Sequence, residues 1–168
     1  MTNKLTKAQK QDLLDKEQGI LQGLLKAKEM ISTAEQSISV RHYDGSELFS
    51  FRVQPISVKA VQRLTELATT YKTNRRGVKI VDKVDAQDLH ARIIVEATHP
   101  EDREKIWNNK EIWSHFPNVL APHHLVPEVM LGGAIDAAIE VIEELSGHRI
   151  TAEDLAEKEA EEIDELKN

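Results

Sequence analysis

Histidine and acidic side chains are the groups in this sequence that could carry acid–base or metal chemistry. His123 and His124 are adjacent among seven histidines. Adjacent residues on a helix point about 100° apart, so this pair lacks the i, i+4 spacing with which two helical histidines hold one metal ion. His99 has acidic neighbours in Glu96 and Asp102, but such pairs are common in helical proteins with 30% charged residues. Without a nucleophile elbow, a phosphate loop or a metal-ligand cluster, we expect no catalytic residue, no bound metal and no cofactor.

One cluster of basic residues could bind an anionic partner. It consists of Lys72, Arg75, Arg76, Lys79 and Lys83. No aromatic side chains alternate with these cations in the way that base-stacking proteins use them, and the whole chain has a net charge of −7. We therefore expect no nucleic-acid partner and interpret residues 72–84 as a polar, mobile loop. The same cluster could meet the acidic tails of sister subunits.

Three large aromatic residues lie within ten positions of one another, in a chain that is only 4% aromatic. They are Trp107, Trp113 and Phe116. Two interpretations stay open: they cover the core, or they anchor a protein partner, because tryptophan is enriched at interface hot spots. As a hypothesis we assign partner binding to these three residues together with Leu21 and Leu24.

The elements that would position these side chains begin with an N-terminal helix or extension over residues 1–34. Within it, residues 7–32 have the spacing of an amphipathic helix. The apolar positions are Leu13, Leu14, Ile20, Leu21, Leu24, Leu25 and Ile31. Such a helix could pack on the rest of the chain, pair with another chain, or fold on a partner.

Residues 35–150 are predicted to form a small helical domain with one short antiparallel β-hairpin near residues 38–53. Apolar residues alternate on both sides of Asp44-Gly45, and Asp-Gly favours a tight turn because that turn needs positive φ. Ser57 is the predicted N-cap of the next helix, which extends to Tyr71. Further helices are expected to start near Asp85 and Pro100.

Proline and glycine mark the expected ends of the last two core helices. Pro122 opens a short helix, in which Pro127 predicts a kink or a restart. Gly132-Gly133 is expected to break that helix, and the final helix then covers residues 134–145, with Gly147 as its C-terminal stop.

Composition makes the fold mainly α, with a core of Leu, Ile, Val and Ala. The chain has 168 residues and no cysteine, which excludes disulfides and thiolate chemistry. No apolar run approaches the roughly 20 residues of a membrane span, so we expect no membrane partner. Residues 151–168 form an acidic tail with eight acids and two lysines, a net charge of −6.

Several segments together resemble the tail assembly chaperones of long-tailed phages and defective prophages. Residues 49–57 are similar to the strand-to-helix entry of that family, and residues 91–98 with Pro100 to its central helix and exit. Residues 121–134 resemble its paired last helices, and Ile142 with 145–147 its closing motif. The resemblance covers residues 40–147 and carries no catalytic motif.

The resemblance implies a function in binding rather than catalysis. Proteins of this kind bind the long helical tape-measure protein, keep its apolar stripes from aggregating, and are displaced as the tail tube assembles. It further implies the major tail tube protein and a homo-oligomer as partners, and a place in the host bacterial cytoplasm but not in the mature virion. The leading alternative is an oligomeric scaffold or adaptor subunit that binds a folded protein. A nucleic-acid-linked regulator is the third hypothesis, and an enzyme is the fourth.

Overall fold

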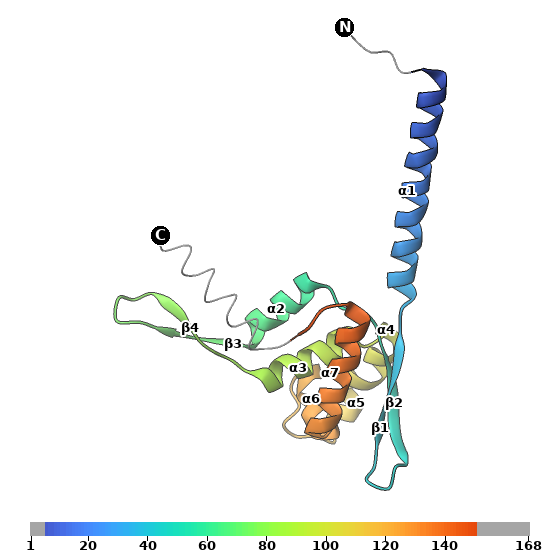
Figure 1. The fold of residues 1–168 in the computed structure, drawn as a ribbon. Coiled ribbons are helices and arrows are strands. Elements are labelled where there is room, and N and C mark those ends of the chain that lie inside the picture. The colour runs from blue at the N-terminus through green and yellow to red at the C-terminus, as the bar shows by residue number, and fades with distance from the viewer. Residues whose placement is uncertain (1–5, 151–168) are drawn as a thin grey trace. The chain divides into compact units, whose positions relative to one another are not determined.

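The protein divides into two compact units, residues 1–34 and 35–168, and each is described by itself. The computed structural model describes residues 6–150, so the predicted acidic tail lies outside the described residues. Within the described part the fold is mainly α, as predicted, and Figure 1 gives the order of its elements.

The first unit is the helix α1 (Lys7–Thr33), which confirms the helix predicted from the apolar spacing. Thr6 and Gln9 form a capping box at its start. The Thr6 Oγ1 accepts a hydrogen bond from the Gln9 N–H at 3.3 Å, and the Gln9 side chain accepts from the Thr6 N–H at 2.9 Å. Among residues 6–150, α1 included, no helix combines the length and the hydropathy of a membrane span.

The second unit opens with the predicted hairpin, formed by β1 (Gln36–Arg41) and β2 (Glu47–Val53). Ile38 lies opposite Phe51 in this antiparallel pair. The turn is one residue longer than a two-residue Asp-Gly turn, because the His42 N–H donates to the Ser46 carbonyl at 2.8 Å. Only Gly45 has positive φ, at 86°, which fits a three-residue loop with its last residue left-handed.

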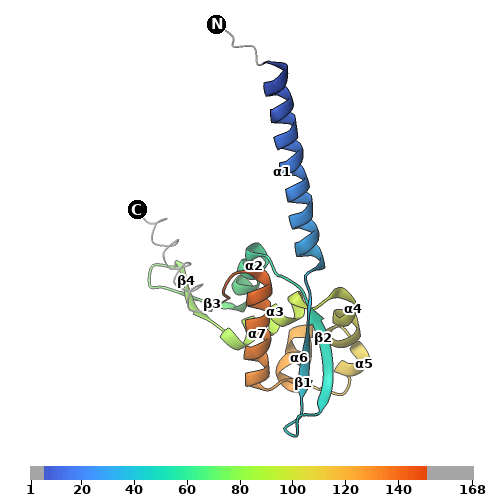
Figure 2. The same ribbon diagram turned by 45° about the vertical axis from the view of Figure 1, so that its right-hand side comes forward.

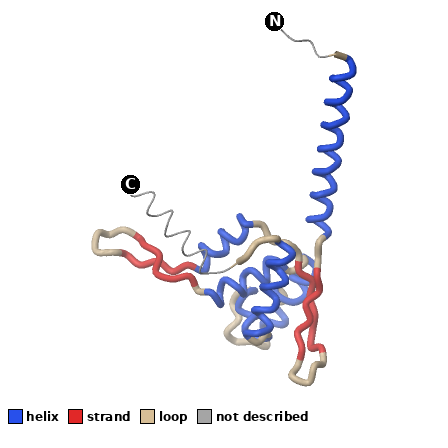
Figure 3. The backbone as a smooth tube through the Cα atoms, viewed as in Figure 1, coloured by secondary structure: helices blue, strands red, loops and turns tan. Residues whose placement is uncertain are grey.

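A second hairpin corrects two predictions, and Figure 3 shows its strands. Residues 72–84 are not a polar loop: β3 (Thr69–Thr73) and β4 (Lys79–Val84) pair antiparallel. The helix α2 (Val58–Ala68) also ends before Tyr71, although its Ser57 cap is as predicted and accepts from the Ala60 N–H at 3.1 Å. Threonine, valine and isoleucine along both strands favour extended backbone over helix.

The core surrounds helix α3 (Ala86–Ala97), which begins after the predicted Asp85 cap. Leu89, Ile93 and Ile94 are completely buried. The helix packs against α2, α6 (Pro122–Val129) and α7 (Gly132–Ser146). Figures 1 and 2 show α6 and α7 side by side next to α3 in both views. A helix covered on several sides must be apolar over more than one face, and α3 is.

The single helix expected after Pro100 is interrupted. α4 (Pro100–Asp102) continues into a π-helical turn, η1 (Arg103–Trp107), in which the Asn108 N–H donates to the Arg103 carbonyl at 2.9 Å. α5 (Lys110–Trp113) then starts anew. Its cap is Asn109, whose Oδ1 accepts from the Glu111 N–H at 3.0 Å. Asparagine satisfies free amides at a helix start, so it favours a restart over continuation.

The ends of the last two helices differ in part from the predictions. Pro122 opens α6 as predicted, and Pro127 lies inside it without ending it. Gly132 and Gly133 do not break a helix; they form the first turn of α7, after extended Met130 and Leu131. Gly147 stops α7 as predicted, with φ of 71° and its N–H donating to the Glu143 carbonyl at 2.9 Å.

Candidate protein interface

The apolar face of α1 is the most exposed hydrophobic surface in the described residues. None of the residues of α1 is buried. Leu21 is 57% exposed and Leu24 is 64% exposed. The other large apolar residues of the face are also exposed: Leu13, Leu14, Ile20, Leu25 and Ile31. The spacing of these residues places them on one side of the helix. Glu17 and Lys28 interrupt this face, but an exposed apolar stripe of this size still indicates a protein-interaction site.

Trp107 belongs to the core, so the surface role assigned to it does not fit the structure. Its exposed fraction is 0%. The indole N–H donates to the Thr98 Oγ1 at 2.9 Å, and the ring meets that of Phe51 edge-on at 5.3 Å. The interpretation that this aromatic residue covers the core applies here. The apolar environment and the satisfied N–H explain why a tryptophan can be buried at this position.

Trp113 and Phe116 lie at the edge of the same core and are partly exposed. The Trp113 indole N–H donates to the Trp107 carbonyl at 2.7 Å, and the Lys110 ammonium lies 3.5 Å from the centre of the Trp113 ring. Both contacts hold the Trp113 side chain in place. This fixed, half-covered aromatic pair stays a candidate contact for a partner, independent of the α1 face.

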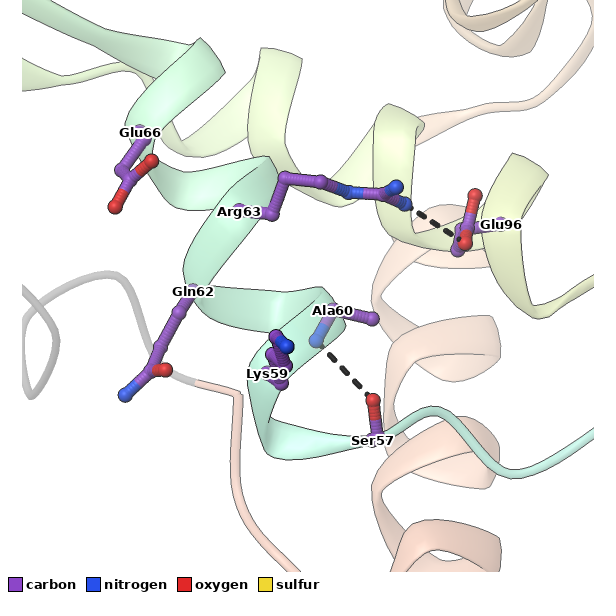
Figure 4. A pocket seen from close by; sticks show the side chains of 7 residues that line it. All are labelled: Ser57, Lys59, Ala60, Gln62, Arg63, Glu66 and Glu96. Atoms are coloured by element: carbon purple, nitrogen blue, oxygen red, sulfur yellow. Dashed lines mark hydrogen bonds and ion pairs between the residues drawn. The ribbon is translucent and has the colours of Figure 1, made fainter.

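The acid–base pairs suggested by the sequence are held in ion pairs. Glu96 accepts from the Arg63 guanidinium at 2.9 Å, across a shallow depression of about 510 Å³ between α2 and α3 (Figure 4). Its other lining residues are Ser57, Lys59, Ala60, Gln62 and Glu66. Both partners of this ion pair are on the surface, and the Ser57 hydroxyl in the lining accepts from the Ala60 N–H as a helix cap. This arrangement therefore names no reaction.

The histidines do not gather around a metal position. Among residues 6–150 there is no group of three or more His, Asp or Glu side chains that could hold a metal ion. His123 is mostly covered, its Nε2 lies 3.3 Å from the Asp88 Oδ1, and its ring centre lies 4.3 Å from that of His124. Burial lowers the pKa of His123 below its usual value, and the nearby Arg92 adds to this effect. The neutral imidazole is therefore the form that the fold favours.

Asp102 joins the first hairpin to the helices. Its Oδ2 accepts from the Arg52 backbone N–H at 2.9 Å and from the Arg52 Nε at 3.0 Å, while its Oδ1 accepts from Nη2 at 2.9 Å. The His99 N–H donates to the Arg52 carbonyl at 2.8 Å, and the Gln54 N–H donates to the Ala97 carbonyl at 2.7 Å. These bonds fix β2 against the end of α3 and the start of α4. The hydrogen bonds from Arg52 lower the pKa of Asp102 to about 2.

Asp102→Asn is expected to lower the free energy of unfolding at pH 7 by about 1–3 kcal/mol, because the charge-assisted fork to Arg52 is lost. The folded-state pKa is below the unfolded one of about 3.9, so the carboxylate contributes fully above about pH 5. This contribution is lost as the pH falls towards about 2. Urea unfolding at pH 7 and near pH 2.5 measures the effect. A difference from wild type that does not shrink in acid would contradict it.

The β3–β4 hairpin is the surface that sequence reasoning missed. It carries the basic cluster, which we interpreted as a loop. The signal was the run of β-branched residues on both sides of Asn74 and Gly77, since Asn and Gly are turn residues. Asn74 and Gly77 indeed form the turn: the Asn74 N–H donates to the Val78 carbonyl at 2.9 Å, and Gly77 has φ of 76°.

Comparison with known protein families gives a match that covers most of the chain. A family model described as phage XkdN-like tail assembly chaperone protein matches residues 21–165. The match includes Leu21 and Leu24, the second half of α1, and every described element after it. No significant match was found among curated proteins or among solved structures.

Proposed function

This chain belongs to the phage XkdN-like tail assembly chaperone family, and from that premise we propose that it binds the tape-measure protein. In this proposal it shelters the apolar stripes of that long helical client and releases them as the tail tube assembles. It needs no catalysis and no cofactor for this, because binding alone changes the solubility of the client. Its place is the host cytoplasm, and it is absent from the finished virion.

The exposed face of α1 is the observation that supports this proposal most. The stripe from Leu13 to Ile31 extends for about 27 Å at 1.5 Å per residue. An amphipathic helix of the client could lie along it and bury apolar residues from both helices. Leu21 and Leu24, both more than half exposed, lie in the middle of the stripe. Many copies of the chain along one client imply modest affinity per site and easy release.

Trp113 and Phe116 form the second proposed contact. They lie in the other unit, are partly exposed, and are backed by the buried core. Rigid aromatic side chains provide large contact area at low entropic cost, which suits a recognition site. The major tail tube protein, which must displace the chaperone, is the partner that we propose for a surface separate from the client-binding helix.

Co-expression tests the proposal. The long helical protein encoded downstream is produced with this chain, with an unrelated acidic protein, or alone, and its soluble yield and co-purification are measured. We expect the soluble yield to rise several-fold only with this chain. An unchanged yield would reject the chaperone role at this client.

The oligomeric adaptor is the alternative, and the same exposed stripe favours it. In that case α1 pairs with α1 of another copy, so the free protein sediments as a dimer or larger species at micromolar concentration. An adaptor leaves the solubility of the helical client unchanged. A monomer that rescues the client supports the chaperone, and an oligomer that does not rescue it supports the adaptor.

A further inference from the structure

The β3–β4 hairpin is a positively charged element on a negatively charged protein. Residues 69–84 contain five cations and one aspartate, a net charge of +4, whereas the whole chain has −7. Lys72 and Asp82 pair with each other at 2.9 Å. The other four cations have no ion pair with any residue in 6–150; they are Arg75, Arg76, Lys79 and Lys83. These four side chains are exposed and form what we call the basic tip.

The hairpin presents the basic tip in a defined way. Its two strands pair with each other, and Figures 1 and 3 show them extending away from α2 and α3, with which they are continuous. The Asn74 Oδ1 accepts from the Arg76 N–H at 2.9 Å and from the Val78 N–H at 3.0 Å, which orders the turn. The basic tip therefore offers four cations to an anionic partner: Arg75 and Arg76 on the ordered turn, and Lys79 and Lys83 along β4.

We propose that the basic tip binds the acidic C-terminal segment, residues 151–168, of the same chain. This segment has eight acids and two lysines, a net charge of −6. Residues outside the hairpin and this segment together have −5, so the rest of the chain, taken as a whole, repels the segment, whereas the hairpin attracts it. Segments of opposite charge attract each other, and each surface ion pair adds a small amount to the binding free energy.

The segment begins close enough to reach the tip. Ile150 is 1% exposed, and its N–H donates to the Glu143 side chain at 2.5 Å, which fixes the point where the segment begins. The Ser146 Oγ accepts from the Ile56 N–H at 2.9 Å, so this end of α7 contacts the chain just before α2. From there α2 leads directly into β3 at Thr69.

The distances agree with binding within one chain. The 11 residues of α2 extend for about 16 Å as a helix, and the five residues of β3 for about 17 Å. These two elements therefore cover at most about 33 Å of the path. The six steps along the chain within residues 146–150 and 56–58 add at most about 20 Å, for a total of about 53 Å. Eighteen residues extend up to about 59 Å. Tethering raises the effective concentration of the segment to the millimolar range, which favours contact within the chain over contact between copies.

Zero-length carbodiimide cross-linking of the full chain tests this contact. Equal amounts of ¹⁴N- and ¹⁵N-labelled protein are mixed in 50 mM salt, and the cross-linked peptides are identified by mass. We expect links from Lys79 or Lys83 to carboxylates within residues 153–165, between peptides of the same isotope. Their yield should fall several-fold in 500 mM salt, because exposed ion pairs are screened. Absence of these links, or links only between isotopes, would overturn the proposal.

A charge variant makes the test specific. Arg75→Gln/Arg76→Gln removes two charges from the tip but leaves both lysines to react, so the yield of these links should fall several-fold. Lys7→Gln/Lys10→Gln on α1 removes the same charge elsewhere and should leave the yield unchanged. Equal yields in both variants would overturn the proposal, as would tight binding of duplex DNA or RNA to the wild-type tip in 150 mM salt. The cross-linking experiment contains no client protein, so its result does not depend on the result of the co-expression experiment.

Discussion

Trp107→Ala is expected to lower the free energy of unfolding by about 3–5 kcal/mol, the range for removing a fully buried large aromatic side chain. The Trp107 ring is completely buried and meets Phe51 edge-on at 5.3 Å. Its removal leaves a cavity beside β2 and also leaves the Thr98 hydroxyl without its indole donor. Both losses act in the same direction. A domain of this size has a total stability of only about 5–15 kcal/mol.

Urea unfolding followed by circular dichroism measures this loss. Leu120→Ala is the control, because Leu120 is 80% exposed and its truncation should change the free energy of unfolding by less than about 0.5 kcal/mol. A loss below about 1 kcal/mol for Trp107→Ala would contradict the core position of Trp107. The large expected loss also means that any binding defect of this variant reports unfolding. Trp113→Ala is the better probe of the aromatic contact, since Trp113 is partly exposed.

Local signals predicted the elements whose ends have specific caps or turns. Ser57 and Asp85 begin helices as predicted, and Gly147 ends one with left-handed backbone. Asp44-Gly45 correctly marked the first hairpin. In each case one residue either caps the end of a helix with its side chain or, as glycine, adopts the left-handed backbone. A short stretch of sequence is therefore enough to predict these ends.

The wrong predictions of secondary structure arose where one property of a segment, such as its charge, was given more weight than the backbone preference of its residues. Charges in residues 72–84 led us to predict a loop, while the β-branched residues between those charges favour strands. Gly132 and Gly133 were interpreted as breakers, but the helix cost of glycine is an entropic one of only about 1 kcal/mol, and both lie in the first turn of α7. The π-helical turn at residues 103–107 gave no recognisable signal in the sequence, and its last residue, Trp107, is buried in the core.

The candidate interface was predictable in part. The apolar spacing of α1 is visible in the sequence, and the structure places Leu21 and Leu24 in its exposed face. The sequence could not distinguish Trp107 from Trp113, because they are six positions apart in a similar polar and apolar context. Only the tertiary fold separates them: Trp107 meets Phe51 across the first hairpin, and Trp113 lies at the edge.

Leu21→Gln/Leu24→Gln is expected to lower the co-purified client at least about tenfold. Glutamine has nearly the helix propensity of leucine and a similar size, so α1 should remain helical while its face becomes polar. Burial of one leucine contributes about 1.5–3 kcal/mol, and 1.4 kcal/mol is a factor of ten in affinity. Pull-down of the client from co-expressing cells measures the loss.

The control uses the opposite side of the same helix. Asp15→Gln/Lys26→Gln introduces the same two side chains on the side of the helix away from the apolar stripe, at positions that are also exposed. It leaves the net charge unchanged and should leave client binding at the wild-type level. Equal losses in both variants would mean that α1 as a whole has been disturbed, which far-UV circular dichroism would reveal. Wild-type binding by Leu21→Gln/Leu24→Gln would exclude this face as the client site and leave Trp113 and Phe116, because they form the other partly apolar surface that we assign to a partner.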